Sequence, residues 1–168
     1  ILQGWIVPTI GSEDYPVMML LNIILGASGL SSRLFLELRE KKGLAYTVRT
    51  AYEIHAKSAA FSIYIGTEPS NIETSIAGFK EEIQKIKDIL VSEEELHNAK
   101  NNWIGKQQFI CETNSQQANM MAYYSVMGRP FDYKQEVIQK VREVTASQIQ
   151  ECARKYFTED YVLAILKP

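Results

Sequence analysis

The sequence predicts an α+β protein with two layers, in which helices pack on one face of a mostly antiparallel sheet. Residues 45–65 alternate apolar and polar side chains with a period of two on either side of a polar loop, a pattern typical of a hairpin. Most segments after residue 70 repeat apolar residues every three or four positions, as amphipathic helices do. Because a hairpin excludes a purely parallel sheet, we expect one sheet covered by one helical layer.

The first 43 residues predict one strand and two helices. Residues 2–9 are apolar and rich in β-formers, and Pro8 and Gly11 end this strand. Residues 14–25 have the length of a helix and are apolar almost all round, so we expect this helix to be deeply buried. After the break at 26–29, Ser31 or Ser32 is placed to N-cap a second helix that ends at Gly43, with an apolar face formed by Leu34, Phe35 and Leu38.

Two strands follow from Ala45. The period of two predicts that one face of the first strand carries Tyr46, Val48, Thr50, Tyr52 and Ile54. Residues 55–58 predict the hairpin loop, and residues 59–65 predict the second strand.

The remaining chain predicts several helices and a closing strand. Capping-box signatures, in which Ser or Thr precedes Glu or Gln by three residues, begin helices at Ser70, Ser92 and Thr145. Ser115 is expected to open a helix through Met127, and a short helix is expected over 133–141. Residues 161–166 are an uninterrupted apolar run, which fits a strand covered on at least one face.

Composition narrows the classes of function. The length of 168 residues suits a single domain, and a formal net charge of -2 argues against a general nucleic-acid binder, including an unrelated α+β nucleic-acid module. Two cysteines, Cys111 and Cys152, cannot form a disulfide framework, and we expect both to be reduced and on helices. The longest apolar run, 17–25, is far shorter than the about 20 residues of a membrane span. With no signal peptide visible we expect a cytoplasmic protein without a membrane partner, and the missing initiator Met suggests a piece of a longer polypeptide.

Common catalytic motifs do not occur. Zinc hydrolases need two histidines and a glutamate on one helix, whereas this chain has only His55 and His97, both expected on the surface. We therefore expect no metal site in this chain. The pair Gly26 and Gly29 lacks the Lys-Ser/Thr of a phosphate-binding loop and is better explained by a helix end followed by a helix start.

Arg39 and Tyr46 form the one candidate site. They lie seven residues apart, at the end of a predicted helix and the start of a predicted strand. A guanidinium beside a phenol offers fixed hydrogen-bond donors to a carbonyl or an oxyanion. The structural alternative is an arginine that complements the helix dipole and a tyrosine in the core.

The pattern around this pair resembles the C-terminal half of the pitrilysin-type zinc metallopeptidases, a superfamily that includes insulin-degrading enzyme and the mitochondrial processing peptidase. The resemblance rests on Leu25-Gly26, Ser31 to Phe35 and Leu38 to Tyr46, and it continues through Ser92 to Leu96, Gln116 to Asn119 and Val144-Thr145.

This resemblance implies that residues 1–168 are one non-metal domain, inactive alone, that pairs as a clamshell with a half containing H-x-x-E-H and zinc. The partner half would be in the same polypeptide or a separate subunit, and an isolated domain could form a homodimer. Arg39 and Tyr46 would reach the bound peptide substrate, and Phe35 would help to line its pocket. The alternative is a non-enzymatic subunit of the same fold that binds peptides or scaffolds a complex.

Overall fold

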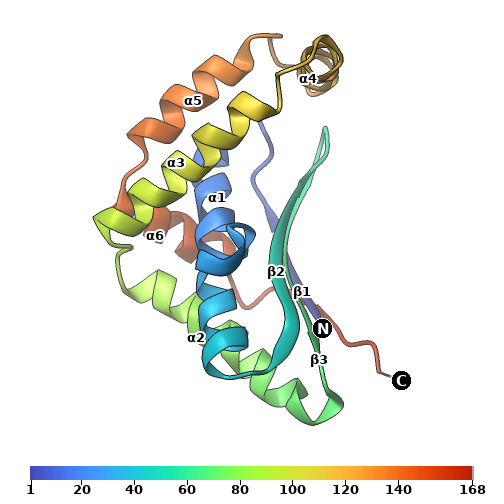
Figure 1. The fold of residues 1–168 in the computed structure, drawn as a ribbon, viewed down its shortest axis with the longest axis vertical. Coiled ribbons are helices and arrows are strands. Elements are labelled where there is room, and N and C mark those ends of the chain that lie inside the picture. Colours follow the sequence, from blue (N-terminus) through green and yellow to red (C-terminus); the bar gives the residue numbers. More distant parts are fainter. Residues whose placement is uncertain (168) are drawn as a thin grey trace.

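Four strands form one antiparallel sheet in the computed structural model, which describes residues 1–167 (Figure 1). In sheet order they are β2 (Ala45–Ile54), β3 (Ala59–Thr67), β1 (Leu2–Val7) and β4 (Val162–Ala164), and each neighbouring pair is antiparallel. The predicted hairpin is β2–β3, joined by a short loop after Ile54. The chain thus has the α+β class that the sequence predicts.

The helices gather on one face of this sheet (Figure 1). Among residues 1–167 they are α1 (Tyr15–Asn22), the π-helix η1 (Ile23–Ala27), the 3-10 helix η2 (Gly29–Ser31), the π-helix η3 (Phe35–Lys41), the 3-10 helix η4 (Pro69–Asn71), α2 (Ile72–Asp88), α3 (Glu93–Phe109), α4 (Asn114–Val126), α5 (Tyr133–Glu143) and α6 (Ala146–Tyr156).

The core lies between the two layers. Side chains of β1 and β3 alternate, and the set facing the helices is buried, including Trp5, Phe61 and Ile63. The rings of Trp5 and Phe61 both pack on Phe157, the residue that follows α6, with centroids 5.0 and 4.9 Å away. Helix α1 is buried from Tyr15 to Leu21, as its nearly uniform apolar sequence predicts. Each fully buried large side chain of this kind stabilises the fold by about 1.5–3 kcal/mol.

Gly26 allows η1 to approach β2 closely. A Cβ at this position would lie 2.6 Å from the backbone nitrogen of Thr50, which no side chain could accommodate without movement. The Thr50 hydroxyl donates to the Asn22 side-chain oxygen at 2.7 Å and so fixes the contact. The glycine at this break therefore serves helix–strand packing.

Some predicted helix starts are correct and others are wrong. Thr145 and Gln148 form the predicted capping box, and Ser92 caps α3 by accepting from the Glu95 amide. Ser70 instead lies in η4, and α2 begins after Asn71 without a side-chain cap. Helix α4 begins one residue earlier than predicted, because a capping box forms at Thr113 and Gln116. The Ser32 hydroxyl donates back to the Gly29 carbonyl and caps nothing.

The last strand is shorter and more exposed than the sequence predicts. Only Val162–Ala164 pair with β1, and their side chains are exposed to solvent in the described chain. Cys111 lies in the turn between α3 and α4, and not on a helix, whereas Cys152 is buried on α6. Both thiols are free. No helix within residues 1–167 has the length and apolar character needed to cross a membrane.

Candidate functional site

The π-helix η3 turns directly into β2 through Gly43. This glycine has a φ of 62°, in the left-handed region that favours glycine. The Leu44 amide donates to the Leu38 carbonyl at 2.9 Å, and the Gly43 amide donates to the Arg39 carbonyl at 3.1 Å. These two bonds close the helix end as Schellman-type motifs do, and they fix the path from Arg39 into the strand.

A β-bulge at the start of β2 points Tyr46 away from the core. Ala45 pairs with Thr67 and Thr47 pairs with Gly66, so Tyr46 has no partner on β3. Its side chain is 86% exposed. The period of two predicts one face for Tyr46 and Val48, but Val48 is buried and Tyr46 is exposed, because the extra residue of the bulge interrupts that period.

The structure brings the three predicted site residues together. The Arg39 guanidinium carbon lies 4.6 Å from the centroid of the Phe35 ring and 5.3 Å from that of the Tyr46 ring. Phe35 is buried, so its ring supports the guanidinium and exposes little surface of its own. Such cation–π contacts are worth about 0.5–1 kcal/mol each at exposed sites, enough to restrict where the guanidinium lies.

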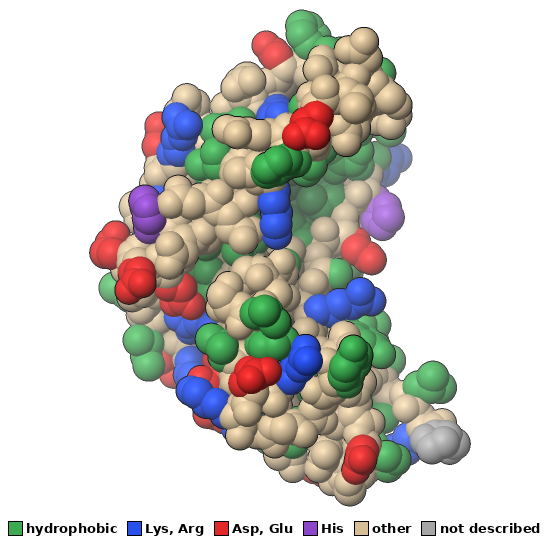
Figure 2. All heavy atoms as spheres, viewed as in Figure 1, with side chains coloured by type: hydrophobic (Ala, Val, Ile, Leu, Met, Phe, Trp, Pro, Cys, Tyr) green, Lys and Arg blue, Asp and Glu red, His purple; other side chains and the backbone are tan. Residues whose placement is uncertain are grey.

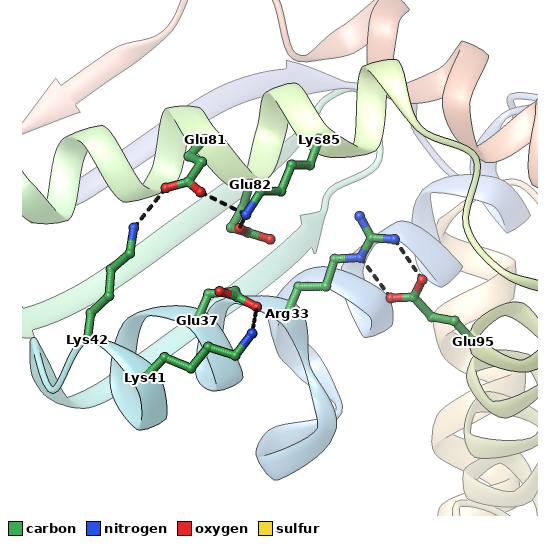
Figure 3. A network of polar contacts seen from close by, with 8 residues as sticks. All are labelled: Arg33, Glu37, Lys41, Lys42, Glu81, Glu82, Lys85 and Glu95. Atoms are coloured by element: carbon green, nitrogen blue, oxygen red, sulfur yellow. Dashed lines mark hydrogen bonds and ion pairs between the residues drawn. The ribbon is translucent and has the colours of Figure 1, made fainter.

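Within the described chain, Arg39 differs from the basic residues around it because it has no acidic partner. Arg33 donates two hydrogen bonds to the Glu95 carboxylate, at 2.7 and 2.6 Å. Lys41 and Lys42 pair with Glu37 and Glu81, at 2.6 and 2.8 Å (Figure 3). Within residues 1–167 the side chain of Arg39 makes neither a salt bridge nor a hydrogen bond. Its N–H donors are therefore available to a ligand.

The paired residues anchor η3 to two other helices (Figure 3). The bidentate bond to Glu95 of α3 raises the pKa of Arg33. At the other end of η3, hydrogen bonds from Lys42 and then Lys85 lower the pKa of Glu81 on α2 to about 2. Between these ends Leu38 is fully buried and packs against Gly78 of α2. The segment that carries Arg39 is thus held on both sides.

The sequence alone did not reveal these anchors. In the sequence, Glu95 belongs to an acidic first turn of a predicted helix, and Glu81 lies among mixed Lys and Glu residues of another. Their partners Arg33 and Lys42 lie 62 and 39 residues away in the chain. No local pattern connects such distant charges, so only the tertiary structure could identify them.

The geometry suits binding of a carbonyl group or an oxyanion, but the donors remain accessible to solvent. The partly buried Arg39 offers charged N–H donors, and the exposed Tyr46 offers an O–H donor. A shallow hollow of about 700 Å³ lies beside Tyr46 and extends to Thr67 and Asn71. Preorganised donors act most strongly where water is excluded, whereas Tyr46 is 86% exposed in this chain.

The residues of this chain do not fit a zinc ion. Within residues 1–167, no cluster of three or more His, Cys, Asp or Glu side chains could hold a metal. His55 lies in the β2–β3 loop, and His97 is on the exposed side of α3, with a ring nitrogen 2.8 Å from the Asn101 amide.

Comparison with known proteins identifies the family. Residues 1–103 match the model of the peptidase M16 inactive domain. The chain is 31% identical to the uncharacterized zinc protease YmxG of Bacillus subtilis, over 95% of this chain and 39% of that protein. It is 28% identical to the uncharacterized zinc protease ML0855 of Mycobacterium leprae, over 100% of this chain and 38% of that protein.

Solved structures share the fold at lower sequence identity. A protease from Helicobacter pylori superposes with a TM-score of 0.80 at 23% identity, over 94% of this chain and 38% of that one. The peptidase M16 inactive domain from Pseudomonas fluorescens superposes equally well, with a TM-score of 0.80 at 22% identity, over 95% of this chain and 38% of that one. The chain therefore belongs to the peptidase M16 inactive-domain family, and it spans less than two fifths of the length of these relatives.

Proposed function

We propose that this chain is the substrate-binding, non-metal half of a zinc metalloendopeptidase, and that Arg39 and Tyr46 bind the reacting peptide. The observation that carries the proposal is the Arg39 guanidinium, which is held between two aromatic rings and has no acidic partner within the described residues. The neighbouring Arg33, by contrast, is paired with the Glu95 carboxylate.

The physical role of the pair follows from the charge that develops during peptide hydrolysis. Zinc in the other half would supply an activated water, and attack on the peptide carbonyl places negative charge on its oxygen. Arg39 would donate charge-assisted hydrogen bonds to this oxygen or to the neighbouring substrate backbone, and Tyr46 would add its O–H. Loss of one such donor can lower the rate by about 10²–10³-fold.

The need for a covering surface supports pairing with a second half. Tyr46 is 86% exposed in this chain, so another domain must exclude water from the site. Because curated relatives are more than twice as long as this chain, we place the zinc-containing half in the same polypeptide, with residues 1–168 as the C-terminal domain. A homodimer of the isolated domain stays a prediction. A cytoplasmic location also stays a prediction, because the fold also occurs in the periplasmic protease PqqL of Escherichia coli.

The test compares kcat/KM for a quenched-fluorescent peptide between the complete parent enzyme and its Arg39→Ala variant at equal zinc content. We expect a loss of about 10²-fold or more. Arg49→Ala is the matched control, because Arg49 also lies near a tyrosine ring, that of Tyr64 at 5.5 Å, but on the strand rather than on η3. Arg49 is exposed, whereas Arg39 is partly buried.

Unchanged kinetics in Arg39→Ala would refute the proposed role of the arginine. If the parent protein bound peptides but cleaved none at full zinc occupancy, the alternative of a non-enzymatic peptide-binding or scaffolding subunit would replace the proposal. An equal loss in Arg49→Ala would show that removal of any surface arginine disturbs the enzyme.

A further inference from the structure

A second concave surface lies at the other end of the molecule, between α1, α3 and α4. It encloses about 580 Å³, within the usual range for ligand pockets. We call it the α4 groove, and define it by Tyr15, Met19, Trp103, Met120, Tyr123 and Tyr124. Figure 2 shows a recess with hydrophobic side chains on this side of the molecule.

Helix α4 presents one regular stripe to this groove. Gln116, Asn119, Met120 and Tyr123 recur at helical spacing and all line it. Only Tyr124 of this helix is buried in the core, although the helix is well begun by the capping box at Thr113. The helix thus forms a wall that is ordered at its start but packs little against the rest of the chain.

The lining is mostly apolar. Among residues 1–167, no Asp, Glu, Lys or Arg side chain lines the groove. Burial raises the pKa of Tyr15, and it raises the pKa of Tyr124 to about 12, so both phenols stay neutral at physiological pH. Met19 and Met120 add flexible, polarizable side chains, which suit surfaces that accept different apolar partners.

Amide side chains border the apolar floor. Gln107 and Asn119 line the groove, and within residues 1–167 their side chains make no hydrogen bond. Gln116 uses its side-chain oxygen for the helix cap, which leaves its amide N–H groups free. A carboxamide offers one acceptor and two donors, the same kinds of group that a peptide backbone requires. The groove therefore matches an uncharged peptide segment better than a charged ligand.

The α4 groove and the Arg39–Tyr46 pair lie at opposite ends of β2 (Figure 1). Tyr15, which lines the groove, packs its ring 6.2 Å from the ring of Tyr52 on β2. Tyr46 and Tyr52 are six residues apart on this strand, a span of about 20 Å at about 3.3 Å per residue. A peptide in extended conformation covers the same distance with about six residues.

We propose that the α4 groove binds a large, uncharged apolar side chain of the peptide substrate, about six residues from the part that contacts Arg39 and Tyr46. The inference rests on the proposed function, because it assumes that the same peptide reaches both places. It assigns to the substrate a preference for an aromatic or long aliphatic residue remote from the cleaved bond. Binding there would raise affinity without changing the chemical step.

The test measures direct binding to this chain, so it does not depend on catalysis. The probe is an acetylated and amidated Gly/Ser peptide with a single phenylalanine, and the readout is tryptophan fluorescence. Trp103 lines the groove, whereas Trp5 is buried in the core and provides a constant background. Met120→Glu places a charge in the groove, and Met121→Glu is the matched control, because Met121 is 46% exposed and does not line it.

We expect saturable binding below about 1 mM, a loss of at least tenfold in Met120→Glu, and no change in Met121→Glu. A peptide with Asp in place of Phe should not bind. Absence of saturable binding, or an equal loss in both variants, would overturn the inference. The inference would also be wrong if Met120→Glu converted a dimer of this chain to monomers in sedimentation analysis and had no effect on peptide binding.

These outcomes are independent of the proposed catalytic role. If Met120→Glu abolishes binding while Arg39→Ala leaves the rate of the parent enzyme unchanged, the groove stands and the role of Arg39 fails. If Arg39→Ala lowers the rate, and neither Met120→Glu nor Met121→Glu changes peptide binding, the role of Arg39 stands and the groove proposal fails.

Discussion

At the Ala45 end of β2, the segment that carries Arg39 is tied to α3 through Arg33–Glu95 and to α2 through Lys42–Glu81. At the other end, α4 borders its groove with only one side chain, Tyr124, buried in the core. The first surface offers fixed donors, whereas the second offers thioethers, aromatic rings and amides on a helix with few neighbours. Stabilisation of a developing charge needs donors already in place, and adaptation to varied side chains needs a surface that can repack.

Leu38→Ala tests the anchored surface at the Ala45 end of β2, and it has the largest expected effect of the four substitutions. Leu38 is fully buried and packs against Gly78, so its removal leaves a cavity beneath Arg39. We expect the free energy of unfolding to fall by about 2–5 kcal/mol in urea denaturation. Val126→Ala on α4 is the control, because Val126 is 75% exposed and should cost less than about 0.5 kcal/mol. Similar losses in the two variants would contradict the contrast between the ends.

Tyr46→Phe separates the O–H donor from the ring. The variant keeps the aromatic contact with Arg39, at 5.3 Å in the native chain, and loses the hydroxyl. We expect kcat/KM of the parent enzyme to fall by about 10²-fold, with zinc content and thermal stability unchanged. Tyr64→Phe is the control, since Tyr64 lies on β3 away from η3. A rate equal to that of the native enzyme would remove Tyr46 from the proposed site.

Thr113→Ala probes the weakly packed end. It removes the N-cap of α4, where the Thr113 side chain accepts from the Gln116 amide, and should cost about 1 kcal/mol of local stability. We expect faster amide hydrogen exchange throughout α4, no change in α2, and little change in global Tm. A global loss as large as that of Leu38→Ala would show that α4 is an integral part of the folding unit.

Glu81→Gln should change how stability depends on pH, with the smallest effect of the four. Hydrogen bonds from Lys42 and Lys85 hold the folded pKa of Glu81 at about 2, below its ordinary value of 4.5. The contribution of ionised Glu81 to the stability of the fold is therefore present above about pH 4.5 and is lost as the pH falls through about 2. Native Tm should exceed that of Glu81→Gln by a small margin near pH 6, and the two should converge at low pH.

The control for this series is Glu73→Gln, because Glu73 is exposed on the same helix and makes no salt bridge within residues 1–167. A constant difference between native and Glu81→Gln proteins down to pH 2 would contradict the lowered pKa. Added salt should reduce the difference, since Glu81 and its partners lie at the surface.

Local patterns predicted many of the elements and selected the residues of the candidate site. The period of two predicted the β2–β3 hairpin, and the spacing of Ser or Thr before Glu or Gln predicted the starts of α3 and α6. The patterns of Ser31 to Phe35 and Leu38 to Tyr46 indicated the family and selected the residues that the structure brings together. These features depend on neighbours within a few positions, which a sequence displays directly.

Only the tertiary structure decided how the site is held and presented. Glu95 satisfies Arg33 from 62 residues away, and the bulge that exposes Tyr46 exists only through its register with β3. The same is true of the α4 groove, where Tyr15 and Tyr123 meet from distant parts of the chain. The sequence by itself determined which residues could act, because chemistry and periodicity are local properties. Their partners, exposure and relative positions were decided by folding, because these depend on contacts between segments with no common local pattern.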